Sequence, residues 1–402
     1  MTSPQTIDGW NGIDFRFFSE GCVKRLAASR DRWVIHEARP KISEVVGGTI
    51  AARVHAATRV ISGVYDHALK VADGSVPFRG RAVWKRIAEP EAKMLGKVFD
   101  DSRHAYYLGY ANFHFGHFLL ETISRAWAWR ERGVECVPVL QSPTTRLPTF
   151  ATVFLDLIPG ISANLEIIGR TTRFSRVIVP HPAFVIAHEA FVEFKRLCET
   201  MAERAVGDFQ GERTEQPLYL SRAGLHPERQ RTLLGEERLE RFLVQQGFLV
   251  VRPETVPVRE QIALFNRHKF IVSAVGSACH TRLFARGVTT LIVLSRDGIP
   301  PNYLLCDRLC AGNSHYANVL SVPELDTRVR LPVEPLMIDC DRLLMLLRDF
   351  GLIGPNAEFC DPPPSLEDYK RRWILAAEAH SRRSGDVTLT DAVRNISSAS
   401  PS

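Results

Sequence analysis

The chain has 402 residues, 45% of them hydrophobic and 24% charged, which is an ordinary balance for a globular protein and a length that suits two domains. Its formal net charge of +6 suits a polyanionic ligand and weak attraction to an anionic membrane surface. Because the chain has no Lys/Arg block with interleaved aromatic residues and no nucleic-acid-binding motif, nucleic acid is excluded as an expected partner.

The eight cysteines are scattered, and no second pair or nearby histidine pair completes a zinc pattern. We therefore expect reduced thiols and no structural zinc site. No other cofactor is expected. No apolar run reaches the roughly 20 residues of a membrane helix. The first residues, MTSPQTIDGWNGIDF, lack the basic and apolar segments of a signal peptide, so a cytoplasmic protein is expected.

The first predicted domain covers residues 1–208, of which the first 100 give no clear pattern beyond several short strands. Strands and helices then alternate. Strands are predicted at 104–110, 134–140 and 176–180. Helices are predicted at 117–129, 147–158 and 188–206. The polar stretch GDFQGERTEQP at 207–217 is the predicted linker.

The second predicted domain, residues 215–330, has the clearest pattern. Apolar strands are predicted at PLYLSR, FLVV, FIVSAV and TTLIVLS, and helices are predicted at 232–246, 258–266 and 277–285. Short helices between apolar strands indicate βαβ units and a parallel sheet covered on both faces. Residues 331–380 are predicted to add C-terminal helices, and residues 381–402 to form a disordered tail.

Two strand ends of this second domain suggest an anion site. The turn Val275-Gly276-Ser277-Ala278 joins a strand to a helix N-terminus, where backbone N–H groups and the helix dipole favour negative charge. Arg222 follows another strand, so it is aimed at the same edge of the sheet, and arginine is suited to phosphate recognition. The turn contains neither G-x-G-x-x-G nor a P-loop, so a plain connection is the alternative reading.

The run NFHFGHFLLETISR at 112–125 places polar groups on an apolar helix. In a regular helix His117, Glu121 and Arg125 would share one face, with His114 one turn earlier. A buried Glu–Arg pair beside a structural histidine is one reading. A metal pair formed by His114 and His117 is another, but it lacks a third ligand.

These segments together resemble glycosyltransferase family 61, which includes capsular-polysaccharide-type bacterial enzymes. The resemblance covers roughly residues 105–300. It rests on Gly116–Arg125 and on the YLSR strand with its Glu-containing helix. It rests also on Gly247–Glu254, Gln261–Phe265, and the segment that holds Gly276, Ser277, Ala278 and His280.

The resemblance implies a GT-B-like α/β fold, in which two Rossmann-like domains with parallel sheets face each other across a cleft. It implies an inverting, metal-independent transferase whose second domain binds a nucleotide sugar and whose first domain faces a glycan or lipid-linked glycan acceptor. The expected donor- and phosphate-binding residues are Arg222, Arg231, Glu236, Glu254, Gly276, Ser277, Ala278 and His280.

An inverting transfer needs a base for the acceptor hydroxyl. His117 is preferred because histidine accepts protons near neutral pH, with Glu121 fixing its ring and Arg125 holding the carboxylate, while Glu121 as the base remains open.

Val275, Thr281 and Gly235 replace polar residues common in the family. A catalytically inactive nucleotide-sugar-binding scaffold protein is therefore the alternative function. An unrelated Rossmann-type oxidoreductase is a third reading, against which the missing glycine fingerprint argues.

Overall fold

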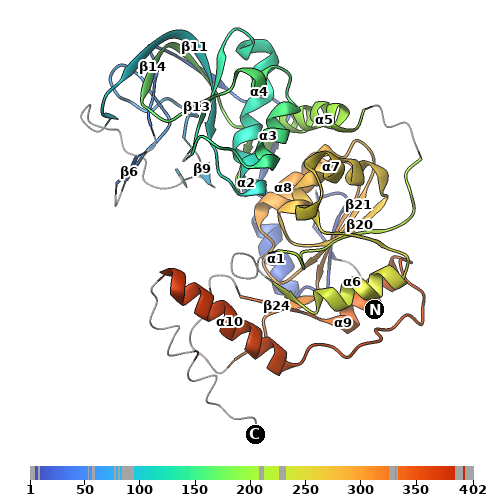
Figure 1. Ribbon diagram of the computed structural model, residues 1–402. Coiled ribbons are helices and arrows are strands. Elements are labelled where there is room, and N and C mark those ends of the chain that lie inside the picture. The colour runs from blue at the N-terminus through green and yellow to red at the C-terminus, as the bar shows by residue number, and fades with distance from the viewer. Residues whose placement is uncertain are drawn as a thin grey trace.

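The computed structural model contains two large β-sheets with helices packed between and around them, so the predicted α/β class is confirmed (Figure 1). The structure describes residues 5–7, 10–52, 54–56, 59–76, 78–79, 82–83, 95–142, 144–207, 212–225, 232–325, 331, 334–384 and 393. In these residues no helix is both long and apolar enough to cross a membrane.

The lower sheet in Figure 1 is built mainly from the second half of the chain. Its parallel strands are β17 (Leu218–Leu220), β19 (Leu249–Val251), β20 (Phe270–Ala274), β21 (Thr290–Ser295) and β22 (Ser314–Asn318). They are connected by α6 (Glu236–Gln245), α7 (Val258–Arg267), the 3₁₀ helix η7 (Ser277–Phe284) and α8 (Pro301–Leu309). The prediction of βαβ units and a parallel sheet is confirmed here.

The order of these strands is β19-β17-β20-β21-β22, which places the second strand in sequence outside the first. This 2-1-3-4-5 order is one of the two common doubly wound arrangements. Connections leave the sheet in opposite directions on either side of the β17–β20 pair. Such a switch point is where open α/β sheets bind ligands, beyond the carboxyl ends of the strands.

The helices of this half follow their apolar spacing. Leu239, Phe242 and Leu243 form the buried face of α6, and Ile262 and Phe265 lie on the buried face of α7. The predicted helix at 232–246 is shorter than expected, because its first residues form the short strand β18 (Leu233–Leu234). The predicted helix at 277–285 is a 3₁₀ helix, with a tighter turn than an α-helix.

The upper sheet is mixed, which corrects the expectation of a parallel sheet in the first half. The strands β11 (Phe99–Tyr110), β12 (Val137–Gln141), β13 (Glu166–Ile168) and β14 (Thr172–Pro180) are parallel. The strands β4 (Ile42–Val46) and β5 (Thr49–Ile50) run antiparallel along β14, and β8 (Val64–Tyr65) pairs with β5. Its helices are α3 (Thr149–Asp156), α4 (Ile161–Asn164) and α5 (Val192–Val206).

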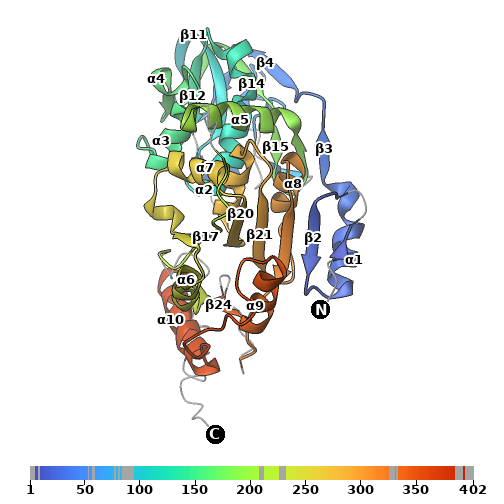
Figure 2. The same ribbon diagram turned by 90° about the vertical axis from the view of Figure 1, so that its right-hand side faces the viewer.

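The N-terminal segment belongs to the lower sheet, contrary to the predicted first domain at residues 1–208. The strand β2 (Ile13–Arg16) pairs in parallel with β22, and β1 (Gln5–Thr6) pairs with β2. Phe15 is fully buried and stacks on Tyr316, so this strand completes the lower core. In Figure 2, β2 and α1 (Glu20–Ala28) lie along the edge of the lower sheet before β3 (Val34–His36) leads upward.

The C-terminal segment, predicted as separate helices at 331–380, is also tied to the lower half. The strands β18, β23 (Leu320–Ser321) and β24 (Leu336–Ile338) form a small sheet, followed by α9 (Cys340–Asp349) and α10 (Leu366–Ser384). Most of the predicted tail at 381–402 lies outside the described residues.

The remaining short strands form smaller ladders. They are β15 (Phe184–Val185) and β16 (Glu189–Phe191), which join β3, and the hairpins β6 (Val54–Ala56) with β7 (Arg59–Ile61) and β9 (Phe78–Arg79) with β10 (Ala82–Val83).

The two halves share one hydrophobic core and are packed tightly together. The rings of Phe154 on α3 and Phe284 on η7 stack with centroids 5.7 Å apart. Lys195 on α5 is buried and donates hydrogen bonds to the carbonyls of Leu283 (3.0 Å) and Ala285 (2.6 Å). These contacts hold the C-terminal end of η7 against the upper half. The turn that joins β20 to η7 is thereby held in place as well.

Candidate active site

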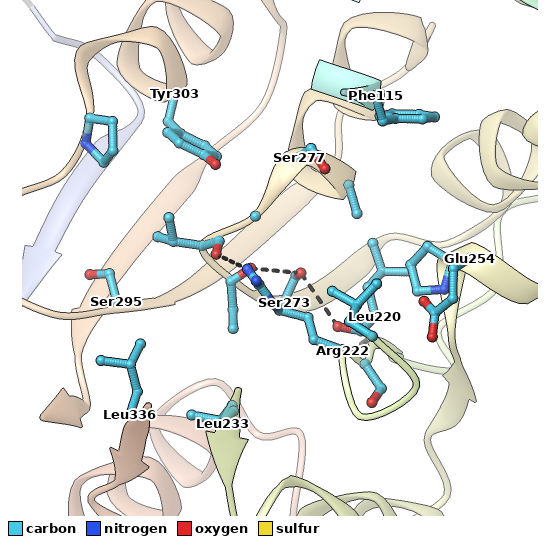
Figure 3. A pocket seen from close by; sticks show the side chains of 18 of the residues that line it. Phe115, Leu220, Arg222, Leu233, Glu254, Ser273, Ser277, Ser295, Tyr303 and Leu336 are labelled. Atoms are coloured by element: carbon cyan, nitrogen blue, oxygen red, sulfur yellow. Dashed lines mark hydrogen bonds between the residues drawn. The ribbon is translucent and has the colours of Figure 1, made fainter. Parts of the chain in front are cut away.

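A pocket of about 540 Å³ lies at the carboxyl ends of the strands in the lower sheet, at the switch point between β17 and β20. Residues that follow β17, β20 and β21 form its floor (Figure 3). Phe113, His114 and Phe115 from the upper half also line it. Six of the residues predicted from the sequence line this pocket: His114, Arg222, Glu254, Gly276, Ser277 and Ala278.

Arg222 and Gly276 are in direct contact in the middle of the pocket. The Arg222 guanidinium donates a hydrogen bond to the carbonyl of Val275, the residue before the glycine. A Cβ atom at position 276 would lie 2.5 Å from Nη1 of Arg222. A side chain at this position would therefore push the guanidinium away, and glycine is what lets the arginine lie against the turn. The two predicted phosphate-binding elements form one surface, as the sequence suggested.

The turn after Gly276 presents the start of η7 to the pocket through Ser277 and Ala278. The first N–H groups of a helix have no acceptor within that helix. They are suited to bind an anion, and the guanidinium of Arg222 adds a positive charge beside them.

Glu236 contacts the protein rather than the pocket. Its carboxylate, which is 2% exposed, accepts hydrogen bonds from the Tyr219 hydroxyl (2.8 Å) and from the backbone N–H of Arg222 (2.7 Å). Burial raises the pKa of Glu236 above its ordinary value. Gly235, directly before it, has a φ of 85°, a conformation that glycine and asparagine adopt most readily. Glu236 therefore holds the backbone from which Arg222 projects.

His280 is also outside the pocket lining, where it packs between the two halves. Its ring contacts the side-chain amide of Asn302 at 3.1 Å and lies against Tyr303, with ring centroids 4.6 Å apart. A Cβ at Gly116 would lie 2.9 Å from Cδ2 of His280, so the upper half reaches directly over this ring. Burial lowers the pKa of His280 to about 3, and the ring is neutral at neutral pH.

His117 and Glu121 form the pair that their spacing predicted. Nδ1 of His117 lies 3.1 Å from Oε2 of Glu121, and the side chains are 29% and 13% exposed. The His117 ring also lies against His114, at a centroid distance of 5.1 Å, and His114 lines the pocket. The pair is thus one side chain removed from the pocket wall.

The main hydrogen bonds of Arg125 differ from the predicted hold on the Glu121 carboxylate, which acts on Arg125 through its charge. Arg125 is buried and donates to the backbone carbonyls of Gly74 (2.6 Å) and Pro180 (2.9 Å). The predicted regular helix at 117–129 is instead α2 (Phe115–His117), the π-helical segment η3 (Phe118–Thr122), the 3₁₀ segment η4 (Ile123–Ala128) and the π-helical segment η5 (Trp129–Gly133). A 3₁₀ helix has about three residues per turn, so a residue four positions on lies about a third of a turn away from the first.

Glu254 lines the pocket near Gly224, whose missing side chain leaves room for its carboxylate. Arg231 lies outside the described residues. Within the part of the chain that is described, no three His, Cys, Asp or Glu side chains form a group that could hold a metal ion.

Sequence reasoning missed several lining residues that share one signal: they lie within two residues of the carboxyl end of a parallel strand, as Arg222 does. These are Ser221, Ser273, Ser295 and Arg296. Gln261 and Tyr303 also line the pocket, and they come from α7 and α8.

Comparison with known proteins gives one family match. Residues 115–292 match the family model described as Glycosyltransferase 61, a range that runs from α2 into β21. No curated protein matches the chain.

Among solved structures, a likeness is found to the dodecameric iron-containing heptosyltransferase TibC in complex with ADP-D-beta-D-heptose. It is 9% identical, covers 84% of this chain and 82% of that chain, and has a TM-score of 0.26. With so low a TM-score, the likeness carries no argument about this chain.

Proposed function

From the premise that the chain is a glycosyltransferase, which its match to the family 61 model supports, we propose that it moves a sugar from a nucleotide-sugar donor to a glycan acceptor with inversion and without a metal ion. The observation that carries the proposal is the pocket itself. It combines a phosphate-binding turn at the switch point with side chains of the upper half, next to the His117–Glu121 pair. The proposed arrangement is GT-B-like, with the donor on the lower half and the acceptor approaching the upper half.

The donor diphosphate is proposed to lie against Arg222 and the turn from Gly276 to Ala278. A guanidinium and outward-pointing backbone N–H groups suit phosphate oxygens. When the bond between the sugar and the diphosphate breaks, negative charge grows on the leaving phosphate oxygen. Donors that are already in place stabilise this charge in the transition state without further reorganisation. Arg222 is held for this role by Glu236 through its backbone N–H.

His117 is the proposed base. A hydrogen bond from Nδ1–H to Glu121 would fix the ring and leave Nε2 as the proton acceptor. The acceptor hydroxyl attacks the anomeric carbon, its proton passes to Nε2, and the bond to the diphosphate breaks on the opposite face, which inverts the configuration. Glu121 is the alternative base, because its carboxylate lies 3.1 Å from the His117 ring and so belongs to the same site.

The acceptor is proposed to be a surface glycan of the bacterial capsule or lipopolysaccharide type, in free or lipid-linked form. This class rests on the resemblance to the family. The proposed location is the cytoplasm at the inner face of the membrane, and the net charge of +6 suits attraction to that anionic surface. Binding to anionic vesicles that weakens as salt is raised would support this location, whereas equal binding to neutral and anionic vesicles would argue against it.

The function is tested by a thermal-shift screen against nucleotide sugars and their nucleoside diphosphates, followed by measurement of nucleoside diphosphate release. A ligand at about 100 times its Kd stabilises the folded state by about 2.7 kcal/mol. A stabilising nucleotide sugar that is turned over supports the proposal. Binding without turnover across donors and acceptors would favour the inactive scaffold protein, and no binding at all would refute both.

A further inference from the structure

Arg296 stands out among the charged side chains of the pocket. It follows β21 directly, is half-buried, and lines both the pocket and a second hollow of about 300 Å³. Arg222 donates to Val275, but among the described residues no hydrogen bond or ion pair engages the Arg296 side chain. The acids of the second hollow are engaged elsewhere, since Asp297 accepts from Asn318 and Asp339 caps α9.

The pocket has two chemically different ends, with Arg222 between them (Figure 3). Phe115 and Tyr303 lie at one end, together with Ser277. Leu233 and Leu336 lie at the other, and Leu320 adds a third leucine from the same small sheet, formed by β18, β23 and β24. Arg296 and Leu320 are the residues that the pocket shares with the second hollow.

The direction of the donor follows from these ends, and this step rests on the proposed function. The sugar must point toward His117, which belongs to the upper half, and the diphosphate takes the turn at Gly276. The nucleoside then extends away from the upper half, toward the leucines. Three leucine side chains offer the apolar faces that a planar base needs, and Arg296 belongs to the same end because it lines both hollows together with Leu320.

We propose that this leucine end holds the nucleobase and that Arg296 selects a base with a carbonyl oxygen at C4 of a pyrimidine or C6 of a purine, as in uracil or guanine. A guanidinium carries five N–H donors and no acceptor. It therefore pairs with carbonyl oxygens, as arginine does with O6 and N7 of guanine. It has no acceptor for the amino group that cytosine and adenine present at the corresponding position. An unpaired polar group left in the pocket would disfavour those bases.

The test measures binding of UDP, CDP, GDP and ADP to the full chain by calorimetry. UDP and CDP differ at C4, where uracil has a carbonyl oxygen and cytosine an amino group, and in the proton on the adjacent N3. GDP and ADP differ in the same sense at C6 and N1, and guanine has a further amino group at C2. The base with the carbonyl oxygen should bind more tightly in at least one of these pairs, by roughly ten- to a hundredfold. Either pair that shows this preference identifies the base, because a slot shaped for one ring size favours pyrimidines or purines as a class.

Arg296→Met then separates base recognition from general attraction to phosphate. Lost positive charge weakens both members of a pair equally, whereas lost base recognition removes the ratio between them. The variant should bring that ratio to within about threefold, and Arg267→Met, which alters an exposed ion pair on α7, should leave it unchanged. The melting temperature without ligand confirms that both variants are folded.

A ratio that persists in Arg296→Met would overturn the inference, and so would equal binding within both pairs by the wild-type chain or tighter binding of CDP and ADP. In these cases nucleotides still bind and the proposed function stands. If no nucleoside diphosphate binds to the wild-type chain, the proposed function fails together with the inference.

Discussion

Glu236→Ala is expected to destabilise the fold because it removes the acceptor of two buried hydrogen bonds. The carboxylate accepts from the Tyr219 hydroxyl at 2.8 Å and from the backbone N–H of Arg222 at 2.7 Å. A buried donor that loses its partner costs about 1–3 kcal/mol, so the two together cost about 2–6 kcal/mol. The lower part of this range is expected, because the variant also removes the cost of burying the carboxyl group.

Glu236→Gln separates the acceptor from the charge. The amide keeps an oxygen in the same place, so its expected cost is below about 1 kcal/mol. Burial raises the pKa of Glu236, so in the wild-type chain the unfolded state releases this proton at a lower pH than the folded state. The free energy of unfolding therefore falls as pH rises from the ordinary glutamate pKa through the raised one. Glu236→Gln should remove this part of the slope.

The assay is urea unfolding at several pH values, followed by fluorescence and circular dichroism, with Glu237→Ala as the control. Glu237 is the next residue on α6 and is exposed, so its loss should cost at most about 1 kcal/mol through the helix dipole. An ordinary surface substitution changes the free energy of unfolding by about 0.5 kcal/mol. If Glu236→Ala lowers it by no more than this, the two hydrogen bonds do not stabilise the pocket as argued. An unchanged pH slope in Glu236→Gln would refute the raised pKa.

Three further outcomes are expected. Lys195→Met should lower the free energy of unfolding by about 2–4 kcal/mol in denaturant titrations, because two buried carbonyls lose their donor; a loss no larger than that of the exposed Arg196→Met would contradict this. His280, whose pKa is lowered to about 3, should show ring NMR signals that do not titrate above about pH 4. Because the unfolded ring binds a proton below about pH 6.5, stability should fall as pH drops from there toward 3, and His280→Phe should lessen that fall. His117→Ala should reduce kcat by about 10²- to 10⁴-fold and Glu121→Gln by less, if histidine is the base; folded variants that both keep near-wild-type turnover would exclude the pair from catalysis.

The lower half of the fold could be predicted well because its strands are short apolar runs between helices with clear 3.6-residue spacing. Such runs identify a parallel sheet, and the parallel sheet then places the residues after its strands at one edge. That reasoning brought Arg222 and Gly276 together correctly. Arg296 follows β21 in the same way, but it lies outside the segments that resemble the family, and so the strand pattern alone pointed to it.

The two ends of the chain could not be placed from sequence because their contacts are with distant residues. The strand β2 pairs with β22, some 300 positions later, and β18 pairs with β24 about 100 positions later. Nothing in the local pattern of a four-residue or two-residue strand specifies its partner. The predicted first domain therefore includes N-terminal residues that pack with the lower half. The predicted C-terminal helices likewise belong to the lower half.

The upper site was only partly predicted. Residues at i and i+4 lie on one face only while the helix is regular. His117 and Glu121 met as expected, but the change from π to 3₁₀ turns shifted Arg125 off their line, and its guanidinium binds backbone carbonyls instead. The helix propensities of the individual residues are weak, and they do not predict such a change in the type of turn. Apolar residues on both sides of the segment bury it whichever turn it adopts, and packing rather than propensity decides the geometry.

The most direct test of the central claim is calorimetry of nucleotide-sugar binding with Arg222→Ala beside Arg267→Ala. The variant removes the guanidinium that lies on the Gly276 turn and leaves the fold of the lower sheet in place, which circular dichroism can verify. A pocket that binds the donor diphosphate through Arg222 predicts at least a tenfold loss of affinity, the ordinary worth of a hydrogen bond to a charged group, and no change in the control. Wild-type affinity in Arg222→Ala would place the donor elsewhere and contradict the account.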